Sequence, residues 1–302
     1  MSLAPTGQPQ SKVTITSIQQ KKVHREPITC LTAYDYTSAR LVDEAGIDLI
    51  LVGDSLAQVM LGYENTLPVT VEEMLHHTRA VKRGVRRSLI VADMPFSSYH
   101  ISRRDALHNA ARFLKEGGAE AVKIEGGEKR ADLVARLIEA EIPVMGHIGL
   151  TPQSVHAMGG YKVQGKTLEA IEQLMRDAIS LERAGAFSVV LEGIPREVAA
   201  MITRELKIPT IGIGAGPECD GQILVFHDLL GLNLGTPAKF VRQYADLHGT
   251  ISSALEAYRH DVEGGMFPAD NESYHLPKET AAAFEPVLVR KRGPEHEHLA
   301  AD

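Results

Sequence analysis

Short apolar runs alternate along the chain with longer stretches in which apolar residues recur every three or four positions. The short runs have the length of buried strands, at about 28–34, 48–54, 88–94, 120–125, 143–148, 187–192, 209–214 and 223–226. The longer stretches predict amphipathic helices, most clearly at 71–85, 103–116 and 167–184. Strand and helix alternate about eight times, which indicates a parallel α/β fold.

Local signals sharpen the helix boundaries. Thr70 and Glu73 have the spacing of a capping box, which predicts a helix start at residue 71. Glycines stand where four helices are expected to end, and each would take the left-handed conformation there: Gly46, Gly84, Gly117 and Gly185.

One internal repeat bears on the architecture. The segment GGAEAVKIEGG…EIPVMGHIG resembles AGAFSVVLEGI…KIPTIGIGAG, with Glu125 and Glu192 separated by 67 residues and Pro143 and Pro209 by 66. A near-constant offset over successive βαβ units favours rotation about a common axis, as in a (β/α)8 barrel. A doubly wound open sheet remains the alternative, with less reason to repeat.

Charged side chains follow five of the apolar runs. Asp54 closes LILVGD, Asp93 closes SLIVAD, Glu125 closes AVKIE, His147 follows PVMG, and Glu192 closes SVVLE. A buried parallel strand has no reason to end in a charge unless that end opens onto a polar site. Because the carboxyl ends of barrel strands meet at one mouth, we expect these residues to converge there.

Three of these residues are hard oxygen donors with no soft ligand near them in the pattern. Asp54, Asp93 and Glu125 therefore suit Mg²⁺ before Mn²⁺ or Ca²⁺. The alternative is that each carboxylate caps a helix or pairs with Lys or Arg. Lys123 lies two residues before Glu125 and points to the same side of the strand. It either pairs with the acids or stabilises charge that develops on a substrate oxygen.

The remaining candidates have side chains that could remove a proton next to a carbonyl group or bind the substrate during that step. Glu192 has apolar neighbours in sequence, and partial desolvation suits a general base. His147 could orient a substrate oxygen or shuttle a proton, or be a hydrogen-bonded core residue. Ser55 could bind a substrate carboxylate or be a plain turn serine. Cation, ammonium and base together predict enolisation of an α-keto acid.

Composition excludes several other classes. The 302 residues carry a net charge of −7, so no basic field attracts nucleic acid or an anionic membrane. Cys30 and Cys219 lie far apart, which argues against a disulfide framework or a zinc site and fits a reducing cytoplasm. We expect no secretion signal and no membrane span. GIGAG (212–216) lacks the G-x-G-x-x-G spacing and predicts a tight turn rather than a dinucleotide site.

Domain organisation is predicted as a flexible N-terminal tail (1–12), a single barrel domain (13–268) and a C-terminal extension (269–302). The extension is expected to be partly disordered or to lie in oligomer contacts. The long connections 55–70 and 149–166 are candidates for binding loops or lids.

The segment TAYDYTSARLVDEAGIDLILVGDSLAQVMLGYENTLPVTVEEMLHHTRAVKRG resembles the N-terminal half of the ketopantoate hydroxymethyltransferase (3-methyl-2-oxobutanoate hydroxymethyltransferase) family. VADMPFSSY, AVKIEGG, PVMGHIGLTPQSVHAMGGYKVQGKT, VLEGIP and IGIGAGPECDGQILVFHDLLG match further family motifs in order, over about residues 12–268. The resemblance implies a (β/α)8 TIM barrel of the pyruvate/phosphoenolpyruvate-type superfamily. It also implies transfer of a hydroxymethyl group from 5,10-methylenetetrahydrofolate to α-ketoisovalerate, which gives ketopantoate (2-dehydropantoate) for pantothenate and coenzyme A.

Carried onto this sequence, the resemblance implies one Mg²⁺ per subunit at Asp54, Asp93 and Glu125. It implies keto-acid contacts from Asp54, Ser55, Asp93 and Lys123, a proton acceptor at Glu192, and an active-site histidine at His147. Family members assemble as homodecamers, described as pentamers of dimers. Two alternatives stay open: a lyase or mutase of the isocitrate lyase kind, which needs a cysteine on a gating loop, and an inactive scaffold that serves as an interaction protein.

Overall fold

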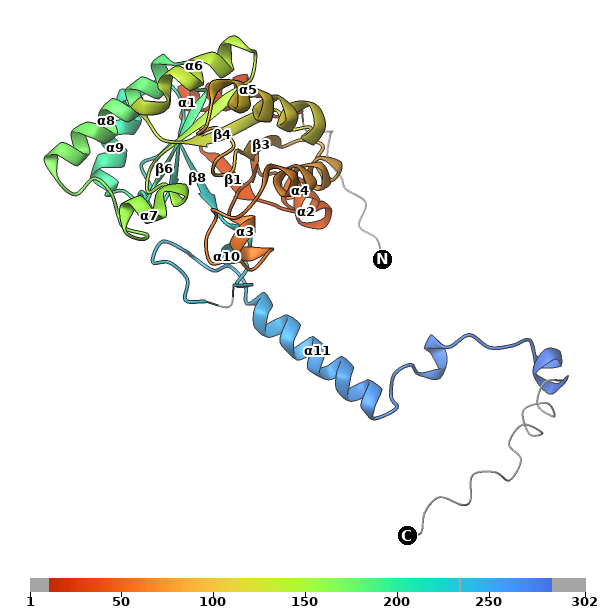
Figure 1. The fold of residues 1–302 in the computed structure, drawn as a ribbon. Coiled ribbons are helices and arrows are strands. Elements are labelled where there is room, and N and C mark those ends of the chain that lie inside the picture. The colour runs from red at the N-terminus through yellow and green to blue at the C-terminus, as the bar shows by residue number, and fades with distance from the viewer. Residues whose placement is uncertain (1–10, 234, 284–302) are drawn as a thin grey trace, which may run out of the picture. The chain divides into compact units, whose positions relative to one another are not determined.

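Eight parallel strands close into a barrel in the computed structural model, which describes residues 11–233 and 235–283 (Figure 1). The strands follow one another around the barrel in chain order, and the last pairs with the first, with Cys30 opposite Ile223. They are β1 (Ile28–Thr32), β2 (Leu49–Val52), β3 (Leu89–Asp93), β4 (Ala121–Glu125), β5 (Val144–Gly149), β6 (Ser188–Glu192), β7 (Thr210–Ile213) and β8 (Gly221–Leu224). The predicted barrel is confirmed, and the open sheet is excluded.

Helices cover the outside of the barrel between successive strands. They are α2 (Tyr36–Glu44), α4 (Val71–Gly84), α5 (Arg103–Arg112), α6 (Ala131–Glu139), α8 (Leu168–Arg183) and α9 (Arg196–Glu205). Three shorter helices lie in connections that follow strands: α3 (Leu56–Val59) after β2, α7 (Val155–Met158) after β5 and α10 (Phe226–Leu229) after β8. Short turns of other helix types are η1 (Phe113–Gly117), η2 (Glu128–Arg130) and η3 (Pro152–Ser154). The capping box predicted at Thr70 and Glu73 is present at the start of α4. No helix in the described ranges is long and apolar enough to cross a membrane.

The glycine predictions are half right. Gly46 and Gly185 have positive φ, 81° and 95°, and follow their helices as expected. Gly84 instead lies inside α4, and a Cβ there would stand 2.6 Å from the carbonyl oxygen of Tyr36. This glycine is therefore set by close packing of α2 against α4. The prediction for Gly117 is wrong by one residue, because Gly118 takes the left-handed conformation, with φ of 75°.

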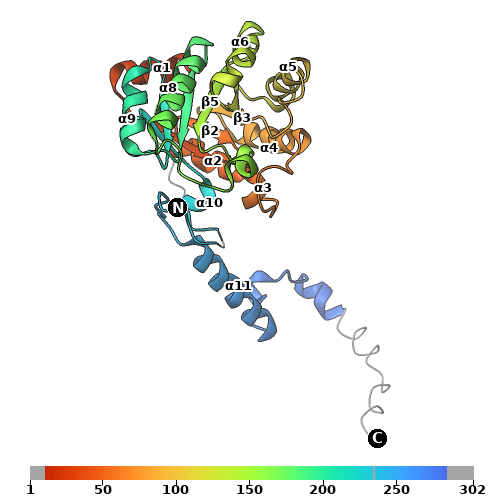
Figure 2. The same cartoon turned by 60° about the vertical axis from the view of Figure 1, so that its left-hand side comes forward.

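Helix α1 (Ile15–His24) closes the amino-terminal end of the barrel, which we call the floor. Ile18 is fully buried in the apolar cluster that fills the barrel interior. Figures 1 and 2 show α1 at the end opposite α3 and α10, which follow the carboxyl ends of β2 and β8. With one end closed, the mouth at the other end is the place for a site.

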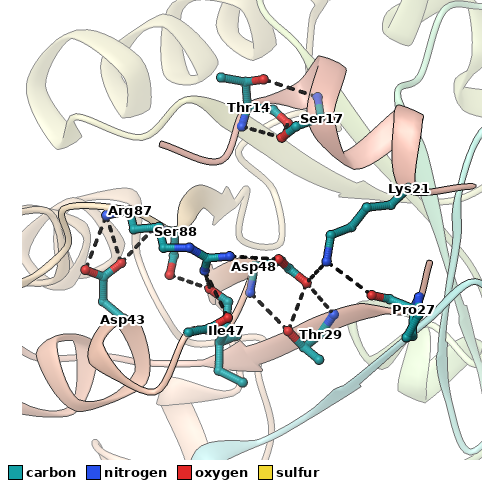
Figure 3. A network of polar contacts seen from close by, with 11 residues as sticks. Thr14, Ser17, Lys21, Pro27, Thr29, Asp43, Ile47, Asp48, Arg87 and Ser88 are labelled. Atoms are coloured by element: carbon teal, nitrogen blue, oxygen red, sulfur yellow. Dashed lines mark hydrogen bonds and ion pairs between the residues drawn. The ribbon is translucent and has the colours of Figure 1, made fainter. Parts of the chain in front are cut away.

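Charged side chains at the floor are tied into complete hydrogen-bond networks (Figure 3). Asp48, 2% exposed, accepts hydrogen bonds from Lys21 Nζ at 2.7 Å and from Arg87 Nη2 at 3.2 Å. Its Oδ2 also accepts from the backbone N–H and the hydroxyl of Thr29, each at 3.0 Å. Beside it, Asp43 accepts from the backbone N–H of Ser88 at 2.6 Å. These charges fasten α1 and the strand starts together.

A second compact unit begins at Leu247, just after the barrel unit ends at Asp246. It contains α11 (Leu247–Glu263) and η4 (Asp270–Glu272). This division falls earlier than residue 268, where the sequence predicted the barrel domain to end. The predicted division into domains stays a prediction, and most of the predicted tail (1–12) and residues 284–302 of the extension lie outside the described residues.

Candidate active site

All seven side chains singled out from the sequence line one cavity of about 90 Å³ at the mouth of the barrel. They are Asp54, Ser55, Asp93, Lys123, Glu125, His147 and Glu192. Strand register explains the convergence, because Asp93 lies opposite Lys123, Glu125 opposite His147, and Gly149 opposite Glu192 on neighbouring strands. The geometric expectation is therefore met, while the role of each residue stays a prediction.

Lys123 pairs directly with one of the acids. Its Nζ lies 2.8 Å from Asp93 Oδ2, and its side chain is 4% exposed. The backbone N–H of Asp54 donates to the same Asp93 oxygen at 3.2 Å. Burial acts to lower the pKa of Lys123, but Asp93, Glu125 and Asp54 outweigh it and raise that pKa. The lysine is thus held as a cation, and the pairing alternative holds for Asp93.

The mouth nevertheless contains more buried negative than positive charge. Burial, together with Asp93 and Glu125, raises the pKa of Asp54 well above its usual range. Burial also raises the pKa of Asp93. Asp93 Oδ1 and Glu125 Oε1 are buried without a hydrogen-bond partner. An unpartnered buried oxygen is costly, so this set of acids is arranged for a positively charged ligand.

The donor set fits Mg²⁺. In the described ranges, no three His, Cys, Asp or Glu side chains already form a closed metal cluster. A closed cluster is not required, because Mg²⁺ usually keeps several waters and binds through one or two carboxylates plus substrate oxygens. Asp93 Oδ1 and Glu125 Oε1 offer such oxygens. The chemistry of the three predicted ligands is therefore compatible with a hydrated ion, and their role as ligands stays a prediction.

His147 connects the acids to Glu192. Its Nε2 lies 3.1 Å from Glu192 Oε2, at ion-pair distance but without hydrogen-bond geometry, and its Nδ1 lies 3.5 Å from Glu125 Oε1. Burial and Lys123 act to lower the pKa of His147, but Glu125 and Glu192 raise it to about 9. Lys123 Nζ lies 3.3 Å from Nδ1 and can only donate, so that contact is a hydrogen bond only when Nδ1 carries no proton.

Glu192 is the most exposed of the mouth carboxylates, with 16% of its side chain accessible. Its sequence neighbours are apolar, as noted above, yet the fold brings His147 against it from the adjacent strand. Glu192 is therefore partly desolvated and lies at ion-pair distance from the imidazole ring. Ser55, at the start of α3, exchanges a 2.8 Å hydrogen bond with the hydroxyl of Tyr34, which is fully buried.

Sequence reasoning missed two residues that organise the acids. Gln153 Nε2 donates to Asp54 Oδ2 at 2.9 Å, and the Gln153 backbone N–H donates to Glu125 Oε2 at 3.0 Å. The hydroxyl of Tyr99 donates to Gln153 Oε1 at 2.6 Å and accepts from the backbone N–H of Glu125 at 3.1 Å. Neither residue stands at a strand end, and neither carries a charge, so the pattern that identified the other candidates does not include them. The only signal was that Gln153 lies in the long loop after β5.

The fold and the acid-rich mouth define a (β/α)8-barrel enzyme. Two solved structures have the same fold: a 2,3-dimethylmalate lyase of the PEP mutase/isocitrate lyase superfamily (TM-score 0.56, 17% identity, 94% of this chain and 98% of that one) and a phosphonopyruvate hydrolase complexed with oxalate and Mg²⁺ (TM-score 0.57, 13% identity, 92% and 96%). These likenesses confirm the predicted fold, a closed (β/α)8 barrel.

Sequence similarity is far more specific. Residues 12–270 match the family described as ketopantoate hydroxymethyltransferase. A 3-methyl-2-oxobutanoate hydroxymethyltransferase from Koribacter versatilis (strain Ellin345) is 68% identical over 96% of this chain and 98% of its own length. The chain belongs to the ketopantoate hydroxymethyltransferase family, as the motifs predicted, and is thus a one-carbon transferase.

Proposed function

We propose that this protein transfers a hydroxymethyl group from 5,10-methylenetetrahydrofolate to α-ketoisovalerate, giving ketopantoate, in a reaction that depends on Mg²⁺. The observation that carries the proposal is the arrangement of the mouth. Three buried acids, two of which have an oxygen without a hydrogen-bond partner, lie beside the Glu192–His147 pair. Membership of the family supplies the substrates, and the side chains supply a physical account of the reaction.

Asp54, Asp93 and Glu125 would hold the cation. When bound, Mg²⁺ supplies Lewis-acid polarisation of the keto acid and offsets the excess of buried acid. The shifts of Asp54 and Asp93 toward higher pKa are those of carboxylates that lack sufficient positive charge around them.

The chain's other polar groups would bind the keto acid and move the proton. Lys123, held as an ammonium at the centre of the mouth, stabilises negative charge that develops on a substrate oxygen. Ser55, which is hydrogen-bonded to Tyr34 and lines the cavity, would contact the substrate carboxylate. Glu192 removes the proton from C3, and His147 orients Glu192 and stabilises its charged form.

Part of the cavity lining is apolar. It includes Leu51, Val190, Ile213, Ile223 and Leu224. A lining that combines charged and aliphatic side chains suits a small branched keto acid, whose methyl groups would contact the aliphatic residues. After proton removal, C3 bonds to the methylene carbon of the donor, and water supplies the hydroxyl group. The bonds of that carbon to N5 and N10 of the folate break, and tetrahydrofolate leaves with the C3 proton and one proton of water on these nitrogens.

Several broader expectations belong to the same proposal. We infer a cytoplasmic enzyme that assembles as a homodecamer, a pentamer of dimers, and that binds neither nucleic acid nor membrane. The isocitrate lyase alternative gains no support from the cysteines. Cys30 is buried in the barrel interior, where burial raises the pKa of its thiol, and Cys219 lies between β7 and β8.

Turnover of the purified full-length chain tests the proposal. We expect ketopantoate, measured by mass spectrometry, when α-ketoisovalerate, methylenetetrahydrofolate and Mg²⁺ are all present. Product should disappear when Mg²⁺ is removed with a chelator and return when it is restored. A folded, Mg²⁺-saturated protein that forms no ketopantoate would contradict the proposal and favour the inactive scaffold.

A further inference from the structure

Gln153 forms four hydrogen bonds with residues of the mouth, although it has no part in the reaction proposed above. Its side chain is buried, at 5% exposure, in η3 of the long loop after β5. Both functional ends of the amide are used, because Oε1 accepts from Tyr99 while Nε2 donates to Asp54 and to the carbonyl oxygen of Met94, the latter at 3.0 Å. Its backbone N–H is used as well, by Glu125.

These partners come from different parts of the mouth. Asp54 follows β2, Met94 and Tyr99 follow β3, and Glu125 ends β4. A residue of the β5 loop therefore joins three earlier βα connections through direct hydrogen bonds. Burying an amide is favourable only if its groups are paired, and here all of them are. The loop is consequently fixed against the acids by this one side chain.

The orientation of the amide is determined by Tyr99. Because the Tyr99 oxygen accepts from the Glu125 backbone N–H, its own proton is free to point toward Gln153. A hydroxyl that donates must face Oε1, so Nε2 is turned toward Asp54. The reverse orientation would place an amide donor against a hydroxyl donor and the amide oxygen against a carboxylate.

The bonds from Gln153 occupy one oxygen of each of two carboxylates. Asp54 Oδ2 and Glu125 Oε2 are engaged, whereas Glu125 Oε1 remains without a hydrogen-bond partner. The donors are neutral, so they fix the acids without adding a positive charge that would compete with a cation. A hydrocarbon side chain cannot donate, and a carboxylate here would add to the excess negative charge.

We propose that Gln153 is the positioning residue of the mouth: it sets Asp54 and Glu125 for the cation and couples cation binding to order in the β5 loop. This inference rests on the proposed function, since it assumes that the acids bind Mg²⁺. Residues that orient metal ligands typically affect metal affinity by about 10–100-fold. Gln153 acts through the carboxylates and need not touch the substrate.

Calorimetric titration of the full-length protein with Mg²⁺ alone tests the proposal. Gln153→Leu keeps the approximate size and removes the side-chain hydrogen bonds, and we expect its Mg²⁺ affinity to fall by about 10–100-fold. Gln164→Leu is the matched control in the same loop, because the Gln164 side chain bonds only to the carbonyl oxygen of Lys162 among the described contacts. A folded Gln153→Leu protein with wild-type affinity would overturn the proposal.

Tyr99→Phe provides a second variant in case Gln153→Leu does not fold. It leaves Gln153 in place but removes the hydroxyl that orients the amide, so Mg²⁺ affinity should fall by less than in Gln153→Leu. Unchanged affinity in Tyr99→Phe would argue against the orienting step.

Hydrogen exchange separates this inference from the proposed function. In the wild-type protein, Mg²⁺ should slow amide exchange in residues 151–158, and Gln153→Leu should exchange faster there than Gln164→Leu in either condition. If the wild type binds no Mg²⁺, the proposed function fails. The comparison of the two variants without Mg²⁺ still measures how strongly Gln153 orders the loop. Equal exchange in the two variants would overturn that hold.

Discussion

The two ends of the barrel both bury charge, but they do so in opposite ways. At the floor, Asp48 is matched by Lys21 and Arg87 and by two hydrogen bonds from Thr29. Asp220 repeats the arrangement, with an ion pair to Lys22 at 2.7 Å and two hydrogen bonds from one threonine, Thr210. Neighbouring lysines of α1 thus fasten two strand starts.

At the mouth the charges do not balance. Four acids (Asp54, Asp93, Glu125 and Glu192) face two basic side chains (Lys123 and His147), and Asp93 Oδ1 and Glu125 Oε1 have no hydrogen-bond partner. Buried charges at the floor are complete without a ligand, so they serve the fold. Those at the mouth are left incomplete by the fold, which supports the proposed binding of a cation there. Pairing, rather than burial, separates structural from functional charge in this molecule.

The largest expected effect is loss of the proposed base at the mouth. Glu192→Gln keeps the shape but cannot accept the C3 proton, so kcat should fall by about 10²–10⁴-fold while the free energy of unfolding changes little. Steady-state turnover and chemical denaturation measure the two quantities. Glu197→Gln, an exposed change on α9, is the matched control. Near-normal kcat in Glu192→Gln would remove Glu192 from the reaction.

Removal of a buried carboxylate at the floor should have the opposite effect, because it should lower stability and leave kcat unchanged. Asp48→Ala leaves Lys21 and Arg87 without their carboxylate, and we expect the free energy of unfolding to fall by about 3 kcal/mol with normal kcat per folded molecule. The control is Asp132→Ala, which breaks the exposed pair with Arg103 and should cost less than about 1 kcal/mol. Equal costs in urea denaturation would mean that the floor network adds no stability.

The same substitution at both ends gives the sharpest contrast. Burial, Asp93 and Glu125 raise the pKa of Asp54, so its charged form destabilises the metal-free protein at neutral pH. Asp54→Asn should then leave the free energy of unfolding unchanged or raise it by about 1 kcal/mol, while turnover falls.

Asp48→Asn should lower stability instead. Burial acts to raise the pKa of Asp48, but Lys21 and Thr29 lower it, so its contribution is present above the unfolded pKa and is lost as pH falls through the folded value. Chemical denaturation of metal-free protein at pH 7 distinguishes the two variants. A loss of stability in Asp54→Asn as large as in Asp48→Asn would contradict the distinction between the two ends.

The smallest effect concerns one hydroxyl group at the floor. Thr29→Val removes the hydroxyl that donates to Asp48 Oδ2 and accepts from the backbone N–H of Asp48, but it keeps the side-chain shape and the bond from the Thr29 backbone N–H. We expect a loss of about 1 kcal/mol in the free energy of unfolding and no change in turnover. Thermal unfolding and turnover assays check both, and a change in turnover would show that the floor communicates with the mouth.

The arrangement of the mouth could largely be predicted from the sequence, but that of the floor could not. The acids at strand ends, their convergence and the closed barrel follow from apolar runs and an internal repeat, which depend on local patterns. Strand register then brings Asp93 against Lys123. The floor pairings could not be predicted, because the reach of Lys21 to Asp48 depends on where α1 lies across the barrel.

The same limit applies to Gln153 and to Gly84. Gln153 bonds to Asp54 across 99 residues of sequence, through rotamers that only the closed barrel defines. Gly84 is required by the approach of α2 to α4, not by the turn conformation that its place near a helix end indicated. Sequence patterns predicted that the charges at the strand ends meet, whereas the hydrogen-bond partners of these charges required the structure.

The most direct test of the account is exchange of the C3 proton of α-ketoisovalerate in D₂O, followed by NMR without any folate. The mouth as described predicts rapid deuterium incorporation by the wild-type protein with Mg²⁺ present, none above background with a chelator, and none in Glu192→Gln. Absence of exchange in folded, Mg²⁺-loaded wild-type protein, or full exchange in Glu192→Gln, would contradict the claim that these acids hold a cation beside a base.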